Sequence, residues 1–340
     1  MKALIVAPSW IGDTLMAQPL FARLHARYPG MQLDAIAPRW VAPVLQRMAQ
    51  IEMVLDNPFG HGQLDWVGRW RQGREIARRA YDAVYVLPNS LKSALVPAMA
   101  GIPQRIGFTG EARYGLLNIR HTLDKSALPL MVERFAQLAE PPGTLPARPI
   151  PYPVLRSTAD DQAKTLADLG MSKPDKLVAF CPGAEYGPAK RWPAAHFARL
   201  AQLLAADGYA IWLFGSAKDH GVAEQIASAA PGLTHNLCGS TRLDQAIDLL
   251  ALADLVVCND SGLMHVAAAL NRPLVALYGS SSPGFTPPLS AQASILSRQL
   301  DCSPCFKRDC PLGHADCLNQ LLPTDVLNAC RERIAACPKR

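Results

Sequence analysis

The chain has 340 residues, of which 49% are hydrophobic and 18% charged, and its formal net charge is +6. This composition is typical of a soluble globular protein and excludes a disordered or fibrous one, and the length predicts two domains. No apolar run approaches the roughly 18 residues of a membrane-spanning helix. The N-terminus lacks a small-residue cleavage site, so we expect a buried first strand in place of a signal peptide, and a cytoplasmic protein.

Short strands alternate with helices along the whole chain. In the first half the strands are expected at residues 2–7, 33–37, 53–55, 83–87 and 105–108, with helical patterns such as 14–27 and 66–79 between them. A Pro-rich stretch, 140–153, reads as an interdomain connection. In the second half strands are expected at 177–180, 210–214, 255–258 and 274–277, and helices at 194–206, 221–229 and 243–253.

This alternation predicts an α/β fold with two domains, residues 1–160 and 161–340. Each would be a parallel sheet covered by helices on both faces. Two such domains that face each other leave a cleft lined by the carboxyl ends of the strands, where ligands bind in open α/β sheets. The last helix could pack back toward the first domain.

The positive charge lies entirely in the first half. Residues 1–160 contain 18 Lys and Arg against 12 Asp and Glu, whereas residues 161–340 contain 16 of each. The excess indicates a multiply anionic partner, such as nucleic acid, an acidic glycan or a membrane surface. Its densest part is five arginines near Trp66 and Trp70, which form either a binding helix or an ordinary solvated face: Arg69, Arg71, Arg74, Arg78 and Arg79. Nucleic acid is disfavoured because no reader motif is present.

The loop after the first predicted strand contains Gly12 and Asp13. Gly12 permits a tight turn or close approach by a ligand. Asp13 lies at a helix start, where it is either a helix cap or a general base that takes a proton from an attacking hydroxyl.

Two loops of the second half contain groups suited to a nucleotide. Lys190 and Arg191 are adjacent cations just before a helix, and they could neutralise a diphosphate. Asp219 follows a strand, as do the acids that accept hydrogen bonds from a ribose diol in dinucleotide sites. Each signal is weak alone, but together they favour a nucleotide site.

The most informative segment lies between the two apolar runs 255–258 and 274–278. Asp260, Ser261 and Gly262 mark a helix N-terminus there, and backbone N–H groups at such a terminus bind phosphate. An ordinary N-cap would give the same pattern. His265, one turn later, is either a ligand contact or a buried core histidine.

These segments together resemble glycosyltransferase family nine, the ADP-heptose:lipopolysaccharide heptosyltransferases. The resemblance covers essentially the whole chain and is closest to the enzymes that add the second heptose. It rests on the Gly12-Asp13 loop and on four further segments, residues 123–134, 182–185, 190–193 and 259–269. It implies a GT-B architecture, with two Rossmann-like domains that bind the acceptor on the first and the sugar nucleotide on the second.

The resemblance also implies roles for single residues. Asp13 would be the general base, and Lys190 would bind the diphosphate and stabilise the ADP leaving group. Asp260 would contact the donor heptose, the backbone of Ser261 and Gly262 would receive the phosphates, and His265 would support that loop. The remaining assignments are Gly183, Arg191 and Asp219 on the donor side, and Gly12, Asn89 and Lys92 on the acceptor side.

The implied reaction transfers L-glycero-D-manno-heptose from ADP-heptose to a heptose of the lipopolysaccharide inner core and inverts the anomeric centre. It needs a base and cations but no covalent nucleophile, so we expect neither cofactor nor catalytic metal. The acceptor and lipid A are anionic, which fits the basic first half, and we expect the enzyme at the periphery of the inner membrane of a Gram-negative bacterium. Another GT-B enzyme with a different donor or acceptor, and a non-catalytic nucleotide- or glycan-binding module, remain alternatives.

Six of the nine cysteines follow residue 300. Four of them, with His314 among them, have a compact spacing: Cys302, Cys305, Cys310 and Cys317. A cytoplasmic location disfavours disulfides, and the spacing matches no standard zinc module. Free thiols, a structural metal and disulfides all remain open.

Overall fold

The computed structural model describes residues 1–60 and 64–336. It divides into two compact units, Met1–Pro153 and Val154–Arg340. The expected boundary at residue 160 is wrong, because it falls inside helix α7 (Ala159–Asp168), which packs on α10 (Leu243–Ala251) of the second unit. Leu155 also donates its N–H to the carbonyl of Ala269, at 2.9 Å. The second unit therefore begins directly after the Pro-rich stretch.

The first unit is built on a six-stranded parallel sheet with the order β3-β2-β1-β4-β5-β6. Five of its strands coincide with predicted ones to within a residue or two, whereas the three-residue β6 was not predicted. The strands are β1 (Lys2–Val6), β2 (Gln32–Ala37), β3 (Met53–Asp56), β4 (Ala83–Val86), β5 (Gln104–Phe108) and β6 (Ile119–His121). The order reverses between β1 and β4, as in a Rossmann sheet.

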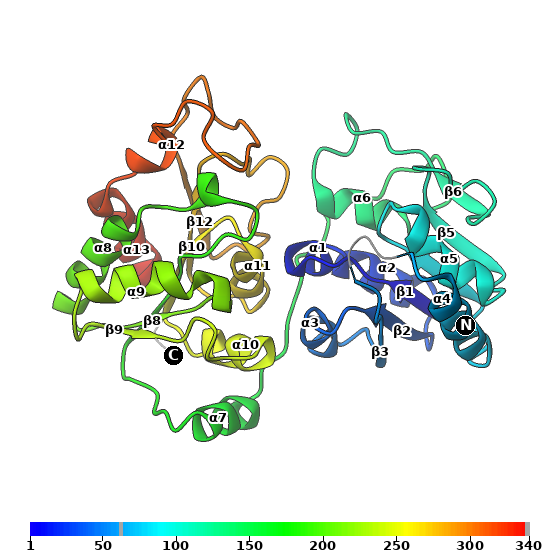
Figure 1. Cartoon of the computed structure of the whole chain (residues 1–340), viewed down its shortest axis with the longest axis horizontal. Helices are drawn as coiled ribbons and strands as arrows, with labels where there is room; N and C mark the ends of the chain where they lie inside the picture. The colour runs from blue at the N-terminus through cyan, green and yellow to red at the C-terminus, as the bar shows by residue number, and fades with distance from the viewer. Residues whose placement is uncertain (61–63, 337–340) are drawn as a thin grey trace. The chain divides into compact units, whose positions relative to one another are not determined.

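Helices cover both faces of this sheet (Figure 1). They are α1 (Ile11–Met16), α2 (Gln18–Arg27), α3 (Ala42–Gln46), α4 (Trp66–Ala77), α5 (Leu91–Met99) and α6 (Met131–Gln137). Helices α4 and α5 pack together and bury Ile76 and Val96 in one core cluster with Leu4 and Val84 of the central strands. The single helix expected at 14–27 is two helices, because α1 ends at Met16 with Ala17 as its C-cap, and Pro19 lies in the first turn of α2.

The second unit repeats this topology with the order β12-β11-β10-β7-β8-β9, again all parallel. Here the order reverses between β7 and β10. The strands are β7 (Leu177–Cys181), β8 (Ala210–Leu213), β9 (Thr234–Asn236), β10 (Leu255–Asn259), β11 (Leu274–Tyr278) and β12 (Ala293–Ser297). The edge strands β9 and β12 were not predicted.

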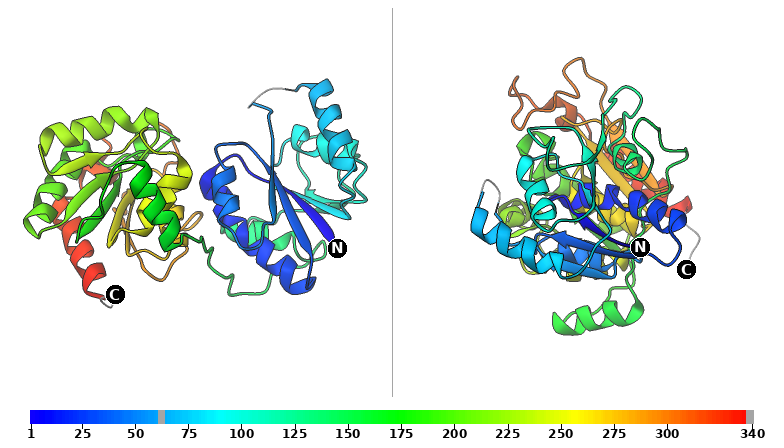
Figure 2. Two further views of the ribbon diagram at one scale, coloured as in Figure 1. Left: turned by 90° about the horizontal axis from the view of Figure 1, so that it is seen from below. Right: turned by 90° about the vertical axis from the view of Figure 1, so that its right-hand side faces the viewer.

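Helices also lie on both faces of the second sheet (Figure 2). Besides α7 and α10 they are α8 (Ala194–Ala206), α9 (His220–Ala229), α11 (Gly262–Ala269), α12 (Asp316–Asn319) and α13 (Pro323–Ala336). The last helix, α13, packs on α8 and on β10, β11 and β12 of its own unit, and Val326 and Cys330 are buried in that core. Packing of this helix toward the first domain stays a prediction.

In Rossmann sheets, ligands bind at the carboxyl ends of the two strands between which the order reverses. In the first unit these ends lead to Gly12-Asp13 after β1 and to Asn89 and Lys92 after β4. In the second they lead to the Lys190 loop after β7 and to Asp260 after β10. The fold therefore brings most of the predicted residues to two such points. Within residues 1–60 and 64–336, no helix is long and apolar enough to cross a membrane.

Candidate active site

The site of the second unit begins with two buried strands that lie side by side. In β7 and β10 every residue is buried, and Cys181 pairs with Cys258 at their carboxyl ends. Apolar side chains hold these strands in the core, so the next polar residues emerge at the sheet edge. These are the Pro182–Lys190 loop on one side and Asp260 on the other.

Asn259 joins the two loops. Its side chain is fully buried, its Oδ1 accepts the Trp192 N–H at 3.0 Å, and its Nδ2 donates to the Pro182 carbonyl at 2.7 Å. A buried amide that bonds to both backbone groups fixes the distance between the two loops, because leaving either backbone group without a hydrogen bond is costly. We did not predict this role. A polar residue that ends a buried strand was visible in the sequence, but its partners were not.

Lys190 and Asp260 form an ion pair at this point. The Lys190 Nζ donates to the Asp260 Oδ2 at 2.6 Å, and the two side chains are 18% and 5% exposed. The ammonium also lies 5.2 Å from the centre of the Tyr186 ring. Partial burial strengthens this attraction relative to a surface pair. The structure thus brings together two predicted donor-site residues that are 70 positions apart.

The N-terminus of α11 is not capped by a side chain. Ser261 is the N-cap residue and has an extended backbone, but its hydroxyl makes no capping hydrogen bond, and Asp260 is occupied with Lys190. Of the two readings of this segment, ordinary capping is therefore not what the structure shows. The first-turn N–H groups of α11, that of Gly262 included, come directly after Asp260, which holds the Lys190 ammonium. Backbone N–H donors and an ammonium group at the same place are a favourable arrangement for binding an anion.

His265 lies in the first turn and a half of α11 and is buried. Burial lowers the pKa of His265 to about 4, with the Lys190 charge lowering it further and the Asp260 charge opposing the change. The imidazole is therefore neutral near pH 7 and adds no positive charge to the site. This favours a supporting role in the loop over a contact with phosphate.

Arg191, Gly183 and Asp219 form a second group nearby. Asp219 accepts from the Ser216 N–H at 2.9 Å and from its hydroxyl at 2.8 Å, and Arg191 Nη2 lies 3.9 Å from its other oxygen. A Cβ on Gly183 would lie 2.4 Å from this carboxylate, so any larger residue there would force Asp219 to shift. Asp219 thus caps the short 3₁₀ helix η2 (Ala217–Asp219), and its contact with a ribose stays a prediction.

Three buried polar atoms near this sheet edge have no hydrogen-bond partner among the described residues. They are the Arg191 Nε and the hydroxyls of Ser280 and Ser281. The two serines follow β11, which is the neighbour of β10. Buried polar atoms are nearly always paired, so these atoms are suited to bind a ligand. The two serines were missed from sequence, although small polar residues directly after the strand at 274–277 were a usable signal.

The Lys190 loop is supported by the cysteine-rich segment. The carbonyl of Arg308 accepts the Ala189 N–H at 2.9 Å, and that of Phe306 accepts the Tyr186 hydroxyl at 2.9 Å. A Cβ on Gly187 would lie 2.5 Å from the Arg308 backbone, which explains the glycine. These contacts hold the 3₁₀ helix η1 (Pro188–Lys190) against the segment from Phe306 to Arg308, and that segment therefore helps to position the Lys190 backbone.

The four clustered cysteines and His314 line one cavity beside Ala189 and Ser280. Backbone N–H groups, that of Ala315 first, lower the pKa of the Cys310 thiol, whereas burial raises that of Cys317. All eight described cysteines are free thiols, and Cys337 lies outside the described residues. In the part of the chain that the structure describes, no group of three or more His, Cys, Asp or Glu side chains could hold a metal ion.

The first unit places Asp13 in the first turn of α1, after β1. Both Gly12 and Asp13 are half-buried. The N-cap residue of α1 is Trp10, which makes no capping hydrogen bond, and the Thr14 hydroxyl donates to its carbonyl at 3.0 Å. Asp13 is therefore not the N-cap of this helix. It lies next to the point where the strand order of the sheet reverses, and its role as general base stays a prediction.

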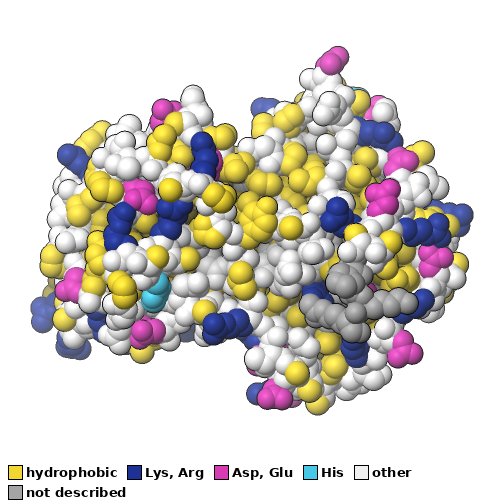
Figure 3. Space-filling model, turned by 180° about the vertical axis from the view of Figure 1, so that it is seen from behind, with side chains coloured by type: hydrophobic (Ala, Val, Ile, Leu, Met, Phe, Trp, Pro, Cys, Tyr) yellow, Lys and Arg dark blue, Asp and Glu magenta, His cyan; other side chains and the backbone are white. Residues whose placement is uncertain are grey.

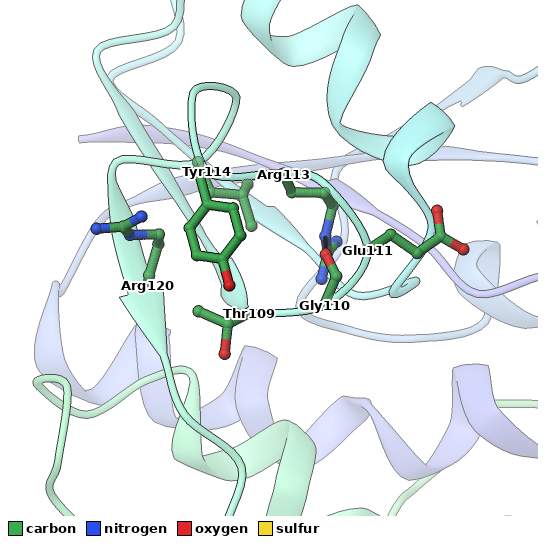
Figure 4. A pocket seen from close by; sticks show the side chains of 7 residues that line it. Thr109, Gly110, Glu111, Arg113, Tyr114 and Arg120 are labelled. Carbon is green, nitrogen blue, oxygen red and sulfur yellow. Dashed lines mark hydrogen bonds between the residues drawn. The ribbon is translucent and has the colours of Figure 1, made fainter.

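Asn89 and Lys92 follow β4 and contact two buried arginines. Arg113, 1% exposed, donates to the Asn89 Oδ1 at 3.1 Å and to the Pro88 carbonyl at 2.7 Å. Arg69 donates to the Lys92 carbonyl at 3.1 Å. Arg113 belongs to the loop between β5 and β6, which forms a pocket lined by Thr109, Gly110, Glu111, Arg113, Tyr114, Leu117 and Arg120 (Figure 4). The acceptor-side residues thus lie on a loop that buried guanidinium groups hold in place.

Known proteins are similar to this chain in sequence and fold. A family model described as glycosyltransferase family 9 (heptosyltransferase) matches residues 69–316. Lipopolysaccharide heptosyltransferase 2 of Escherichia coli K12 is 46% identical over 336 residues, which cover 96% of this chain and 97% of that protein. Lipooligosaccharide heptosyltransferase 2 of Haemophilus ducreyi is 47% identical over 309 residues, 87% of this chain and 88% of that one.

Solved structures agree with the sequence matches. The structure of E. coli ADP-heptose lps heptosyltransferase II has a TM-score of 0.89 and 44% identity, and the match covers 98% of this chain and 99% of that one. The E. coli heptosyltransferase WaaC with ADP has a TM-score of 0.73 at 24% identity, with 98% and 100% covered, and it supports the fold alone. The predicted fold class, GT-B with two Rossmann-like domains, is confirmed. The chain therefore belongs to glycosyltransferase family 9, the heptosyltransferases.

Proposed function

We propose that this protein transfers L-glycero-D-manno-heptose from ADP-heptose to a heptose of the lipopolysaccharide inner core and inverts the anomeric centre. The observation that carries the proposal is the Lys190–Asp260 pair beside the uncapped N-terminus of α11. A cation, a carboxylate and backbone N–H donors at one sheet edge suit a diphosphate attached to a sugar. The names of the heptosyltransferase 2 relatives supply the same donor and acceptor class.

The proposed step is a single displacement. A hydroxyl oxygen of the acceptor attacks the anomeric carbon, and the carbon–oxygen bond to ADP breaks with its electron pair leaving on the phosphate. The hydroxyl proton passes to the Asp13 carboxylate, which acts as general base. Attack from the side opposite the leaving group inverts the configuration, so no covalent nucleophile is required.

The departing ADP needs positive charge. In the proposal, Lys190 supplies it directly, with Arg191 and the α11 N-terminus as further donors. Asp260 holds the Lys190 ammonium in place before the donor binds and then contacts the donor heptose, while Ser261 and Gly262 receive phosphate oxygens. The partnerless Arg191 Nε and the hydroxyls of Ser280 and Ser281 are available to the same ligand. These charges serve the role that a divalent cation has in other transferases, and we infer a metal-independent reaction without cofactor.

The acceptor would bind to the first unit. Its excess of positive charge suits the phosphates and carboxylates of the inner core, and Gly12, Asn89 and Lys92 are the proposed acceptor-side residues. An acceptor attached to lipid A restricts the enzyme to a membrane surface, which we propose to be the cytoplasmic face of the inner membrane.

An assay with defined substrates tests this function. Purified protein is incubated with ADP-heptose and a core acceptor that already carries one heptose, and product and ADP are measured with EDTA and with added magnesium. We expect one added heptose per ADP released in both conditions. Transfer of another sugar, transfer to an acceptor without heptose, ADP-heptose binding without turnover, or activity restored only by magnesium would each contradict part of the proposal.

A further inference from the structure

Helix α4, Trp66–Ala77, contains the highest density of arginines in the basic first unit, and the proposed chemistry does not use it. Its inner face consists of Arg69, Gly73 and Ile76, which are buried at helical spacing. A Cβ on Gly73 would lie 2.8 Å from the Cβ of Met99, so this face packs closely on α5. The inner face therefore fixes which side chains of α4 point outward.

Arg69 belongs to the structure of the unit. Its Nε donates to the Leu64 carbonyl at 2.7 Å, and its guanidinium lies 4.1 Å from the centre of the Phe59 ring. Burial lowers the pKa of this guanidinium. Of the arginines in this helix, Arg71 and Arg74 remain on the outer side, and Arg78 follows as the C-cap residue.

The outer face combines large apolar side chains with these arginines. Trp66, Val67 and Trp70 are 53%, 59% and 52% exposed. Arg74 lies over the Trp70 ring, 5.3 Å from its centre. Among the described residues, no ion pair neutralises Arg71, Arg74 or Arg78, and Glu75 is the one acidic side chain within the helix. We call Trp66, Val67, Trp70, Arg71, Arg74 and Arg78 the α4 face.

Exposed apolar atoms alone do not mark a binding surface. Figure 3 shows hydrophobic side chains scattered among Lys and Arg side chains on one side of the molecule, as on any globular protein. The α4 face differs because two tryptophans one turn apart are each half-exposed and are followed along the helix by arginines without an ion pair in the described part of the chain, one of which lies over the Trp70 ring. Tryptophan and arginine in this combination are typical of helices that lie in the interface of a membrane, where the indole sits at the headgroup level.

We propose that the α4 face docks this protein on an anionic lipid surface. Trp66, Val67 and Trp70 enter the boundary between headgroups and acyl chains, while Arg71, Arg74 and Arg78 contact lipid phosphates. This inference rests on the proposed function only in that a lipid-linked acceptor brings the enzyme to a membrane. An anionic oligosaccharide would pair with the arginines and stack on an indole ring, but it would leave Val67 in water, so lipid is the partner that satisfies the whole face.

Vesicle binding tests the proposal. The full chain is sedimented with vesicles of phosphatidylethanolamine and phosphatidylglycerol, and with vesicles of phosphatidylcholine alone. Two variants alter the face, Trp66→Ser with Trp70→Ser, and Arg71→Gln with Arg74→Gln and Arg78→Gln. Matched controls change exposed side chains elsewhere, Tyr152→Ser, and Lys164→Gln with Lys173→Gln and Arg199→Gln.

We expect about fivefold weaker binding to anionic vesicles per arginine removed, and at least tenfold for the tryptophan variant, with both controls unchanged. Wild-type binding to phosphatidylcholine should be weak, and added salt should weaken binding to the anionic vesicles. Anionic-vesicle binding by both variants at the wild-type level would overturn the proposal.

A parallel assay separates the docking surface from the acceptor site. Transfer to a lipid-linked acceptor in anionic vesicles should fall with vesicle binding, whereas transfer to a deacylated, water-soluble acceptor should stay at the wild-type rate. A raised KM for the soluble acceptor in the variants would instead make the α4 face a glycan site and would overturn docking on lipid. If the wild-type protein transfers no heptose but its vesicle binding still depends on α4, the proposed function fails and the docking surface remains.

Discussion

The two units have the same sheet topology, but their charged groups are arranged differently. In the second, the charged and polar groups at the reversal point are largely buried and bound to one another, as in the Lys190–Asp260 pair and the Asn259 amide. In the first, much of the excess charge lies on exposed arginines, among them Arg71, Arg74 and Arg78, although Arg69 and Arg113 are buried. A closed, mutually paired edge suits a small, fixed ligand such as a sugar nucleotide. An open basic surface suits a large anionic partner.

Asp13→Asn affects the one carboxylate that the first unit is proposed to contribute to the reaction. We expect turnover to fall about 10²–10⁴-fold because the acceptor hydroxyl loses its base. Donor affinity, measured by titration calorimetry with ADP-heptose, should stay near the wild-type value because the donor binds the other unit. Asp56→Asn, an exposed acid of the same unit that pairs with Arg39, is the control. Wild-type turnover in Asp13→Asn would remove Asp13 from the mechanism.

Lys190→Met tests the paired edge of the second unit. We expect kcat to fall about 10²–10³-fold because the departing ADP loses its nearest cation. The buried Asp260 carboxylate also loses its partner, which should lower the free energy of unfolding by about 1–3 kcal/mol in urea titrations. Adding Asp260→Asn should restore stability without restoring kcat. If the double variant is no more stable than Lys190→Met, the loss of stability in Lys190→Met does not come from an unpaired Asp260 carboxylate.

His265 predicts how stability depends on pH. Its folded-state pKa of about 4 lies below the usual value near 6.5, so between these values the unfolded chain binds a proton that the folded chain does not. Stability from this residue is therefore present above pH 6.5 and is lost as the pH falls toward 4, by about 3 kcal/mol at most. His265→Gln should flatten the unfolding free energy across this range, while the exposed His235→Gln should not. Equal slopes in the two variants would exclude a neutral, buried His265.

The smallest expected effect is that of a glycine substitution in the second unit, with a second glycine as its control. Gly183→Ala brings a Cβ to 2.4 Å from the Asp219 carboxylate, so we expect a loss of about 1–3 kcal/mol in unfolding free energy and weaker ADP-heptose binding. Gly221→Ala, in the first turn of α9, meets no atom within 4 Å and should be neutral or slightly stabilising. A Gly183→Ala protein as stable as Gly221→Ala would show that Asp219 can move without cost.

Much of the fold followed from local sequence patterns. The buried central strands and the helix at 194–206 were predicted because apolar runs and helical periodicity are local signals. The strands β6 and β9 are three residues long, and β12 is partly exposed, so none of them has an apolar run to reveal it. The domain boundary was placed too late because the contact of Leu155 with Ala269 joins residues far apart in the chain.

The residues of the site were predictable individually, but their pairing was not. A strand end followed by Asp260 and a helix start indicated an anion site, and adjacent Lys190 and Arg191 indicated a diphosphate. That Lys190 binds Asp260, that Asn259 joins both loops and that Asp219 caps η2 depend on which strands are neighbours. Strand order arises from tertiary packing, so the sequence pattern alone left capping and ligand binding equally open for Asp260.

The configuration of the reaction product tests the proposed chemistry most directly. ADP-heptose of known anomeric configuration is incubated with the protein and a core acceptor that carries one heptose, and the new linkage is assigned by NMR. We predict a single added heptose with a configuration opposite to that of the donor, because the acceptor hydroxyl displaces ADP in one step. A product with retained configuration, or no transferred heptose, would contradict this mechanism.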